Sequence, residues 1–112
     1  MRVFKFGGAS VVDAKSVENL KKIITQQGED LVIIVSAMGK STNKLEAIWE
    51  AKINEENEKA DIQLNDLIKY HENIYTKLSL DDDPLFLKKF HGLFQELNSF
   101  LKTNSPNDVS FY

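Results

Sequence analysis

Residues 31–43 read LVIIVSAMGKSTN, an apolar run that passes directly into a polar, glycine-containing segment. The run Leu31–Val35 is continuous and mostly β-branched, which predicts a strand buried on both faces, as in a parallel sheet. The segment Ser36–Lys40 predicts a loop. A second helix is expected after this loop, with apolar residues on one face at Leu45, Ile48, Trp49 and Ile53.

The residues before this run predict the same order of elements. Residues 2–6, RVFKF, alternate between polar and apolar, which indicates a short strand ended by Gly7 and Gly8. Between the two strands we expect a helix with Asp13 as its N-cap and Gly28 as its C-cap. The first half therefore predicts the order β-loop-α-β-loop-α, two turns of an α/β winding.

The second half has a helical pattern throughout. A polar, acidic link at 54–58 is followed by an apolar stripe from Leu64 to Leu78. The segment 81–84, DDDP, predicts the start of another helix, because acids favour the positive end of the helix dipole and proline favours the first turn. A second stripe runs from Phe86 to Leu101, and Ser105-Pro106-Asn107 ends it. Residues 59–104 thus predict an antiparallel helix pair.

The predicted sheet is incomplete. Two parallel strands do not make a stable sheet, and a helical hairpin cannot cover both of its faces. The segment Val109–Tyr112 reads as the beginning of an extended stretch. We therefore expect the chain to be the front part of a larger α/β protein.

Composition excludes several classes of protein. The 112 residues fit one ordinary domain, and the net charge of −3 argues against nucleic-acid binding by bulk charge. The absence of cysteine excludes disulfides and thiolate chemistry and suits a reducing compartment. No apolar run is long enough for a membrane span, and Met1 opens straight into a strand without a signal peptide. We expect a cytoplasmic protein with no membrane or nucleic-acid partner.

Charge is distributed unevenly along the chain. Residues 1–53 carry 8 Lys/Arg and 6 Asp/Glu, a sum of +2, whereas residues 54–112 carry 6 and 11, a sum of −5. A small anion is therefore expected to bind in the N-terminal half.

The loop after the first strand is suited to phosphate. Gly7 and Gly8 let the backbone approach a ligand closely, and their N–H groups can point at phosphate oxygens. Lys5 lies just before the turn and can reach the same oxygens. A plain Gly-Gly turn beside a surface lysine would have the same sequence. The dinucleotide fingerprint is excluded, because Ala9 and Val12 stand where it requires glycine.

The loop after the second strand lies where open α/β sheets bind ligands. Gly39-Lys40-Ser41 imitates the end of a Walker A loop, but Ile34 stands where that motif needs its first glycine, so no P-loop is predicted. Hydroxyl groups remain at Ser36, Ser41 and Thr42, beside Lys40. Ordinary capping of the following helix by Ser41 or Thr42 explains part of this composition.

Other candidates have simpler structural explanations. His71 and His91 lack a second ligand at metal spacing, and the acidic run 81–83 is explained by helix capping, so no metal site is predicted. No Ser-His-Asp or paired-carboxylate arrangement can be proposed.

Taken together, residues 5–11 and 35–43 resemble the opening of aspartate kinases, in the amino-acid kinase superfamily. The first resembles the family's Lys-Phe-Gly-Gly-Thr/Ala-Ser-Val segment, and the second its Ser-Ala-Met-Gly-Lys-Thr-Thr-Asn loop, with Ser41 replacing the first Thr. The resemblance implies the front part of the carbamate-kinase-like three-layer α/β/α sandwich. In it, residues 1–53 form the β-α-β-α phosphate and substrate loops, and 59–104 form the helical pair, with no regulatory domain.

The resemblance also implies an activity. Aspartate kinases use MgATP to phosphorylate the side-chain carboxylate of L-aspartate, giving 4-phospho-L-aspartate, the first step toward lysine, threonine and methionine. ATP with Mg is then a substrate pair, no tightly bound cofactor or protein-held metal is expected, and the oligomeric state is left open between a monomer and a homo-oligomer.

The site residues carried over by the resemblance fall in the two loops. Lys5 is the expected catalytic residue, and with Gly7 and Gly8 it would contact the transferring and β-phosphates. Ser10 would border the phosphate site, and Ser36 and Thr42 would bind the substrate. Lys40 and Asn43 are further candidates in the second loop, and their roles are less defined.

Several family features lie outside these 112 residues: a Ser-x-Gly-Glu segment, a later catalytic Asp and Lys, and the adenine-binding half. We therefore expect no turnover by this polypeptide alone. Another amino-acid kinase, acting on glutamate, acetylglutamate or a nucleotide monophosphate, is an alternative that the loop 36–43 argues against. A partner-binding module using the helical pair or the open sheet edge is another alternative. A further alternative is a remnant that binds phosphate or carboxylate without turnover.

Overall fold

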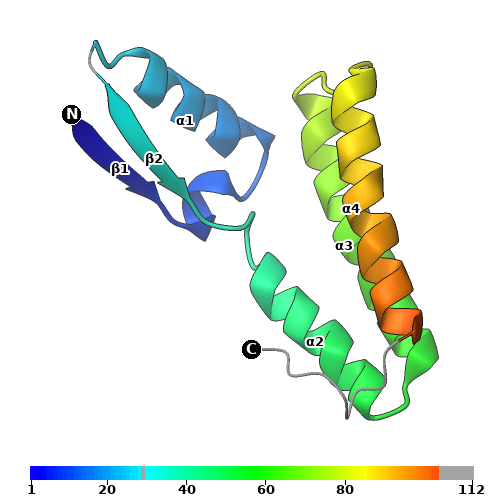
Figure 1. The fold of residues 1–112 in the computed structure, drawn as a ribbon. Coiled ribbons are helices and arrows are strands. Elements are labelled where there is room, and N and C mark those ends of the chain that lie inside the picture. The colour runs from blue at the N-terminus through cyan, green and yellow to red at the C-terminus, as the bar shows by residue number, and fades with distance from the viewer. Residues whose placement is uncertain (29, 104–112) are drawn as a thin grey trace. The chain divides into compact units, whose positions relative to one another are not determined.

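The computed structural model describes residues 1–28 and 30–103, which form two compact units (Figure 1). The first unit, residues 1–42, contains β1 (Arg2–Phe6), the short 3-10 helix η1 (Gly8–Val11), α1 (Ala14–Thr25) and β2 (Leu31–Val35). The second unit begins at Asn43 and is built from α2 (Ser41–Ile53), α3 (Asn57–Lys77) and α4 (Pro84–Thr103). The expected helix break at 105–107 and the extended segment at 109–112 lie outside the described residues.

The two strands form the parallel pair that the sequence predicts. Their register runs from Arg2 opposite Leu31 to Phe6 opposite Val35, with α1 as the crossover between them. Just beyond β2, the amide of Ser36 donates to the carbonyl of Phe6 at 3.0 Å. Because parallel strands end at the same edge, the loops that follow β1 and β2 leave the sheet side by side.

Helix α1 begins at the predicted N-cap. The Asp13 carboxylate accepts a hydrogen bond from the amide of Ser16 at 2.8 Å, and the hydroxyl of Ser16 accepts one from the amide of Asp13 at 3.0 Å. The prediction of Gly28 as C-cap is wrong, because α1 ends at Thr25 and Gln26 is the C-cap. Gln26 keeps right-handed helical backbone angles, so the helix ends without a left-handed residue.

The prediction that residues 31–35 are buried on both faces is also wrong. Four of the five residues of β2 are exposed, and Ile34 shows 49% of its surface. Phe6 lines a small cavity together with Leu20 and Ile23 of α1, so this helix covers the face of the sheet that carries Phe6. Side chains alternate along a strand, and Val3 therefore lies on the opposite face, where it is 60% exposed. Two strands and one helix leave that face bare.

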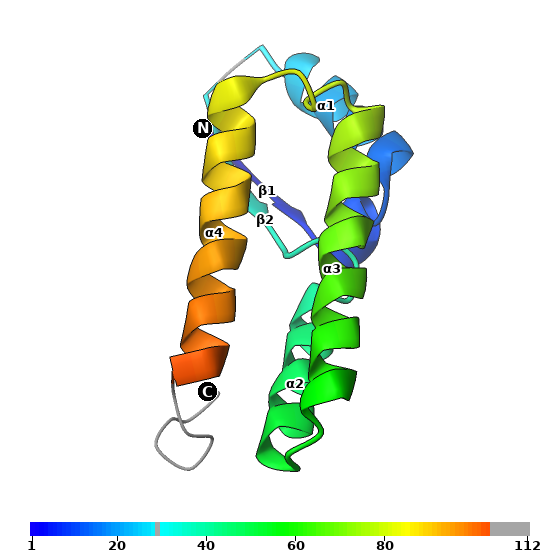
Figure 2. The same cartoon turned by 90° about the vertical axis from the view of Figure 1, so that its right-hand side faces the viewer.

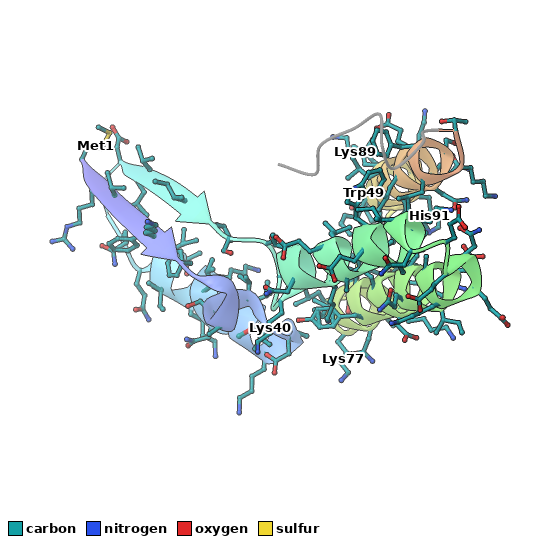
Figure 3. All side chains as sticks on the ribbon, turned by 90° about the horizontal axis from the view of Figure 1, so that it is seen from below. Met1, Lys40, Trp49, Lys77, Lys89 and His91 are labelled. Carbon is teal, nitrogen blue, oxygen red and sulfur yellow. The ribbon has the colours of Figure 1, made fainter. Side chains whose placement is uncertain are left out.

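The second unit holds the larger core. Ile48 on α2 is 1% exposed and belongs to a cluster drawn from all three helices, made by Ile48, Trp49, Ala51, Ala60, Leu64, Leu67 and Leu101. Trp49, labelled in Figure 3, lies on α2. Its ring contacts that of Phe100 of α4, with ring centroids 6.0 Å apart. Helices α3 and α4 run antiparallel, as predicted (Figure 2). The apolar stripes read from the sequence are the surfaces on which these helices pack.

The acidic run before α4 acts as a helix start. The carboxylate of Asp83 accepts a hydrogen bond from the amide of Phe86 at 3.1 Å, and Pro84 is the first helical residue. This arrangement confirms the capping interpretation. Along the described residues, none of the helices combines the length and apolar character that crossing a bilayer requires.

His71 has a structural role. Its Nδ1 lies 2.8 Å from the carbonyl oxygen of Leu67, one turn earlier on α3, and its ring contacts those of Tyr70, Phe90 and Phe94. A histidine that is half-buried among aromatic rings and bonded to its own helix is part of the packing, which agrees with the structural interpretation of this residue.

Candidate functional site

The two candidate loops meet in the first unit. Gly7 continues the extended backbone of β1, and the chain then turns into η1, where the amide of Ser10 donates to the carbonyl of Gly7 at 3.0 Å. The second loop starts at Ser36, whose amide is bonded to Phe6. The order strand–loop in both halves, with a parallel register, is what brings these segments together.

Gly8 lies close against the backbone of the second loop. A Cβ atom placed on Gly8 would lie 2.6 Å from the carbonyl oxygen of Gly39 and 3.5 Å from that of Ala37. The first distance is shorter than any side-chain carbon tolerates, so glycine is required here for a steric reason. Gly39 itself has φ 55°, in the left-handed region that favours glycine. Both glycines therefore serve the contact between the two loops.

The first loop presents unpaired donors. Among residues 1–28 and 30–103, no acceptor pairs with the amides of Gly8 and Ala9, the first two residues of η1. Lys5 is exposed, and it lies on the face of the sheet opposite Phe6, because side chains alternate along the strand. Two free amides and a nearby ammonium group are donors of the kind that bind phosphate oxygens.

Ser10 lies toward α1. It is half-buried and lines a cavity of about 260 Å³ together with Phe6, Ser16 and Leu20. This places Ser10 on the side of η1 that faces the helix. Its expected role at the border of a phosphate site stays a prediction.

The second loop presents exposed polar side chains. Ser36, Lys40 and Thr42 are exposed, and within the described part of the chain their side chains have no hydrogen-bond or ion-pair partner. Hydroxyl groups in this state are available to a polar ligand. Asn43, the next residue on α2, is exposed and belongs to the second unit.

Ser41 differs from its neighbours. It is 5% exposed, and its hydroxyl donates to the carbonyl of Met38 at 2.5 Å. The sequence indicates capping of α2 by Ser41 or Thr42, in which a side-chain oxygen accepts from a helix amide. The Ser41 hydroxyl instead donates to a carbonyl that precedes the helix. No motif marks this role, and the only sequence signal for it is a small hydroxyl residue directly after Gly39-Lys40.

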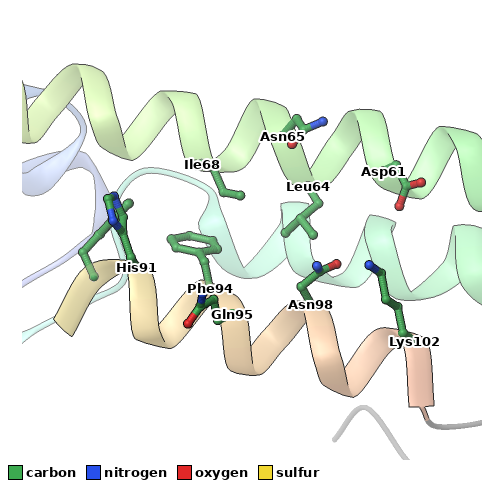
Figure 4. A pocket seen from close by; sticks show the side chains of 10 residues that line it. Asp61, Leu64, Asn65, Ile68, His91, Phe94, Gln95, Asn98 and Lys102 are labelled. Carbon is green, nitrogen blue, oxygen red and sulfur yellow. The ribbon is translucent and has the colours of Figure 1, made fainter. Parts of the chain in front are cut away.

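A separate groove lies between α3 and α4 in the second unit (Figure 4). Its volume is about 560 Å³, and its floor is apolar where Leu64, Ile68 and Phe94 face it. Its rim is polar and carries both charges, with Asp61 on α3 and Lys102 on α4. The rim mixes amides with opposite charges, which does not by itself define a reactive centre.

Comparison with protein-family models adds one finding. The model of the amino acid kinase family matches residues 1–97. The matched region includes both loops, the β1–α1–β2 crossover, α2, α3 and the greater part of α4. Comparison with curated proteins and with solved structures gave no match.

Proposed function

The chain belongs to the amino acid kinase family, and from this premise we propose that it forms the phosphate- and substrate-binding portion of an aspartate kinase. Its two parallel strands and flanking helices are the N-terminal part of the amino-acid kinase α/β fold. The observation that carries the proposal is the backbone contact between Gly8 and Gly39, which joins a phosphate-type loop to a hydroxyl-bearing loop at one edge of the sheet.

The proposed reaction transfers the γ-phosphoryl group of MgATP to the side-chain carboxylate of L-aspartate. The carboxylate oxygen attacks phosphorus, the bond from phosphorus to the bridging oxygen of ADP breaks, and 4-phospho-L-aspartate and ADP leave. Such transfer depends mainly on positioning and on neutralisation of charge. Lys5 and the amides at Gly7 and Gly8 supply positive charge and donors for the phosphate oxygens, which are preorganised because the strand and η1 hold them.

The second loop supplies the contacts to the amino-acid substrate in this proposal. The hydroxyl of Ser36, directly after β2, and that of Thr42, in the first turn of α2, are exposed, and each can donate to a carboxylate or accept from an ammonium group. Lys40 and Asn43 flank this loop and have supporting roles. The likeness of residues 36–43 to the aspartate kinase loop favours L-aspartate over other amino acids.

Phosphate binding is tested by titrating the 112-residue chain with inorganic pyrophosphate and following backbone amide resonances. We expect saturable shifts at Gly7 and Gly8. Lys5→Met should weaken this binding at least about tenfold, because a charge-assisted hydrogen bond is lost. The matched control Lys15→Met removes an exposed lysine from α1 and should change the affinity by less than about twofold. Equal weakening in both variants would indicate binding by overall charge and would contradict the proposal.

The substrate is tested by a second titration with L-aspartate in the presence of pyrophosphate. Shifts at Ser36 and Thr42 support the proposal. L-glutamate, which is one methylene longer, serves as the comparison ligand. A hydrophobic or steric misfit of one methylene is worth roughly 1–3 kcal/mol, so L-glutamate should bind roughly 10- to 200-fold more weakly. Equal or tighter binding of L-glutamate would favour a different amino-acid kinase.

Turnover is tested in two settings. We expect no ADP release from MgATP and L-aspartate by the 112-residue polypeptide, since these residues contain no counterpart to the family's adenine-binding half. Replacement of the corresponding N-terminal segment of an active aspartate kinase by residues 1–97 of this chain should preserve aspartate phosphorylation. A hybrid that folds but prefers another acceptor would overturn the assignment of the substrate.

A further inference from the structure

The turn that leads into α2 is held by one buried hydroxyl. Ser41 is the buried polar residue of the described chain, with 5% of its surface exposed. Both its amide and its hydroxyl donate to the carbonyl oxygen of Met38, at 3.1 and 2.5 Å. A buried hydroxyl is costly unless it is hydrogen-bonded, and here one carbonyl receives both donors. The orientation of the Met38 carbonyl is therefore fixed from two directions.

The same turn forms the surface on which the first loop rests. Gly39 follows Met38 directly and has φ 55°. Its carbonyl oxygen is the atom that would lie 2.6 Å from a Cβ on Gly8. A change in the Met38–Gly39 peptide would thus move the atom that Gly8 contacts. Ser41 is linked to Gly8 through the backbone of two residues, Met38 and Gly39.

From this geometry we infer that Ser41 is a positioning residue for the phosphate loop. Its hydroxyl holds the Met38 carbonyl, the held carbonyl fixes the left-handed turn at Gly39, and that turn places Gly8. The inference rests on the proposed function only where it assigns phosphate binding to Gly7 and Gly8. Ser41 itself is buried and is assigned no contact with substrate.

The interpretation differs from helix capping. A capping serine accepts a hydrogen bond from an amide of the first helical turn, and its loss weakens that helix. Ser41 is already the first residue of α2, and its hydroxyl acts as a donor to a loop carbonyl. Loss of this hydroxyl is therefore expected to alter the other loop, which a cap would not do.

The test uses the 112-residue chain with inorganic pyrophosphate as the probe and the Gly7 and Gly8 amides as the readout. Ser41→Ala should weaken pyrophosphate binding about tenfold, as expected for loss of one buried hydrogen bond, and should shift the Gly8 amide of the free protein. Ser41→Thr keeps the hydroxyl and should restore both the affinity, to within about twofold, and the Gly8 resonance.

Ser16→Ala is the matched control. The Ser16 hydroxyl donates to the carbonyl of Asp13 at 2.9 Å in the capping box of α1, so this variant also loses a local hydroxyl–carbonyl hydrogen bond. It should leave the Gly8 resonance and the pyrophosphate affinity unchanged. If Ser41→Ala does not fold, Ser41→Cys replaces it, because a thiol is of similar size and a weak donor.

The outcomes separate this inference from the proposed function. If the wild-type chain binds no pyrophosphate, the proposed function fails, while a Gly8 shift in free Ser41→Ala that Ser41→Thr reverses still supports the positioning role. If pyrophosphate binds and Ser41→Ala leaves both the affinity and the Gly8 resonance unchanged, the positioning role is wrong and the proposed function stands. Equal effects of Ser41→Ala and Ser16→Ala would also overturn the inference, since both would then reflect general loss of stability.

Discussion

Ile34 and Ile48 are the same residue type in regular secondary structure, yet they are 49% and 1% exposed. The first lies on β2 in the unit that carries the two loops, and the second lies in the core of the helical unit. In the first unit, the buried apolar residues are Val11 and Ala14. The unit with the two candidate loops thus has few fully buried apolar side chains, whereas the helical unit has a buried apolar core.

The largest expected effect is the difference in unfolding free energy between alanine variants of the two isoleucines. Ile48→Ala removes a fully buried side chain and should lower the free energy of unfolding by about 2–5 kcal/mol. Trp49, the single tryptophan, lies in the same core, so its fluorescence during urea unfolding measures the change. Ile34→Ala is the matched variant and should cost less than about 1 kcal/mol, because the side chain is half exposed. Similar costs for the two would contradict the comparison.

A smaller effect tests the glycine contact. Gly8→Ala places a Cβ against the Gly39 carbonyl and should destabilise the loop junction by about 1–3 kcal/mol, as overpacking does. The measurement is hydrogen exchange of the Ser36 amide, which is bonded to Phe6 across the strand ends. Gly7→Ala is the steric control, since a Cβ on Gly7 would meet nothing within 4 Å and the φ of this residue is −76°. Faster exchange of the Ser36 amide in both variants would show that the loop junction depends on the backbone flexibility of the glycines, and not on the contact between Gly8 and Gly39.

A cap in the helical unit gives a third, smaller effect. Asp83→Ala removes the carboxylate that accepts from the Phe86 amide and should cost about 1 kcal/mol of unfolding free energy. Asp82→Ala, which removes the neighbouring exposed carboxylate, should cost less than about 0.5 kcal/mol. Thermal unfolding followed by circular dichroism compares the two. Equal losses would mean that the acidic run acts through charge and not through the cap.

The smallest effect concerns pH. Desolvation raises the pKa of Tyr75 above its usual value of 10.0, and the nearby carboxylates of Glu72 and Asp81 raise it further. Because the pKa is higher in the folded state, this tyrosine contributes stability that is complete below pH 10 and is lost as the pH rises through the folded pKa. Tyr75→Phe should therefore lose less stability than wild type above pH 10. If the unfolding free energies of the two proteins fall equally with pH above 10, Tyr75 makes no such contribution.

Much of the fold follows from the sequence because local patterns encode it. The alternation in residues 2–6 gives β1, the Asp13 cap gives the start of α1, and the segment 81–84 gives the start of α4. The meeting of the two loops follows as well, since a β-α-β unit with a parallel register sends both loops to one edge.

Two of the remaining features, the exposure of β2 and the contact at Gly8, could not be predicted because they depend on neighbours distant in sequence. The exposure of residues 31–35 depends on which elements cover the sheet. The apolar run shows only that these residues favour a strand. The contact at Gly8 is made by backbone atoms of Gly39, and glycine has no side chain from which a pattern could be read. The hydrogen bond of the Ser41 hydroxyl could not be predicted either. A serine hydroxyl can donate or accept, and the sequence does not show which of the two it does.

The parallel register of β1 and β2 has a consequence for the order of folding. An antiparallel hairpin can form from adjacent residues, but this strand pair must close a long loop that contains the whole of α1. The entropy of closing that loop is lost before any contact between the strands is gained, which slows the step. Contacts within a helical hairpin such as α3–α4 are more local and form earlier by the same argument. When the full-length chain refolds, Gly8 and Gly39 are therefore expected to come together after the helical hairpin has formed.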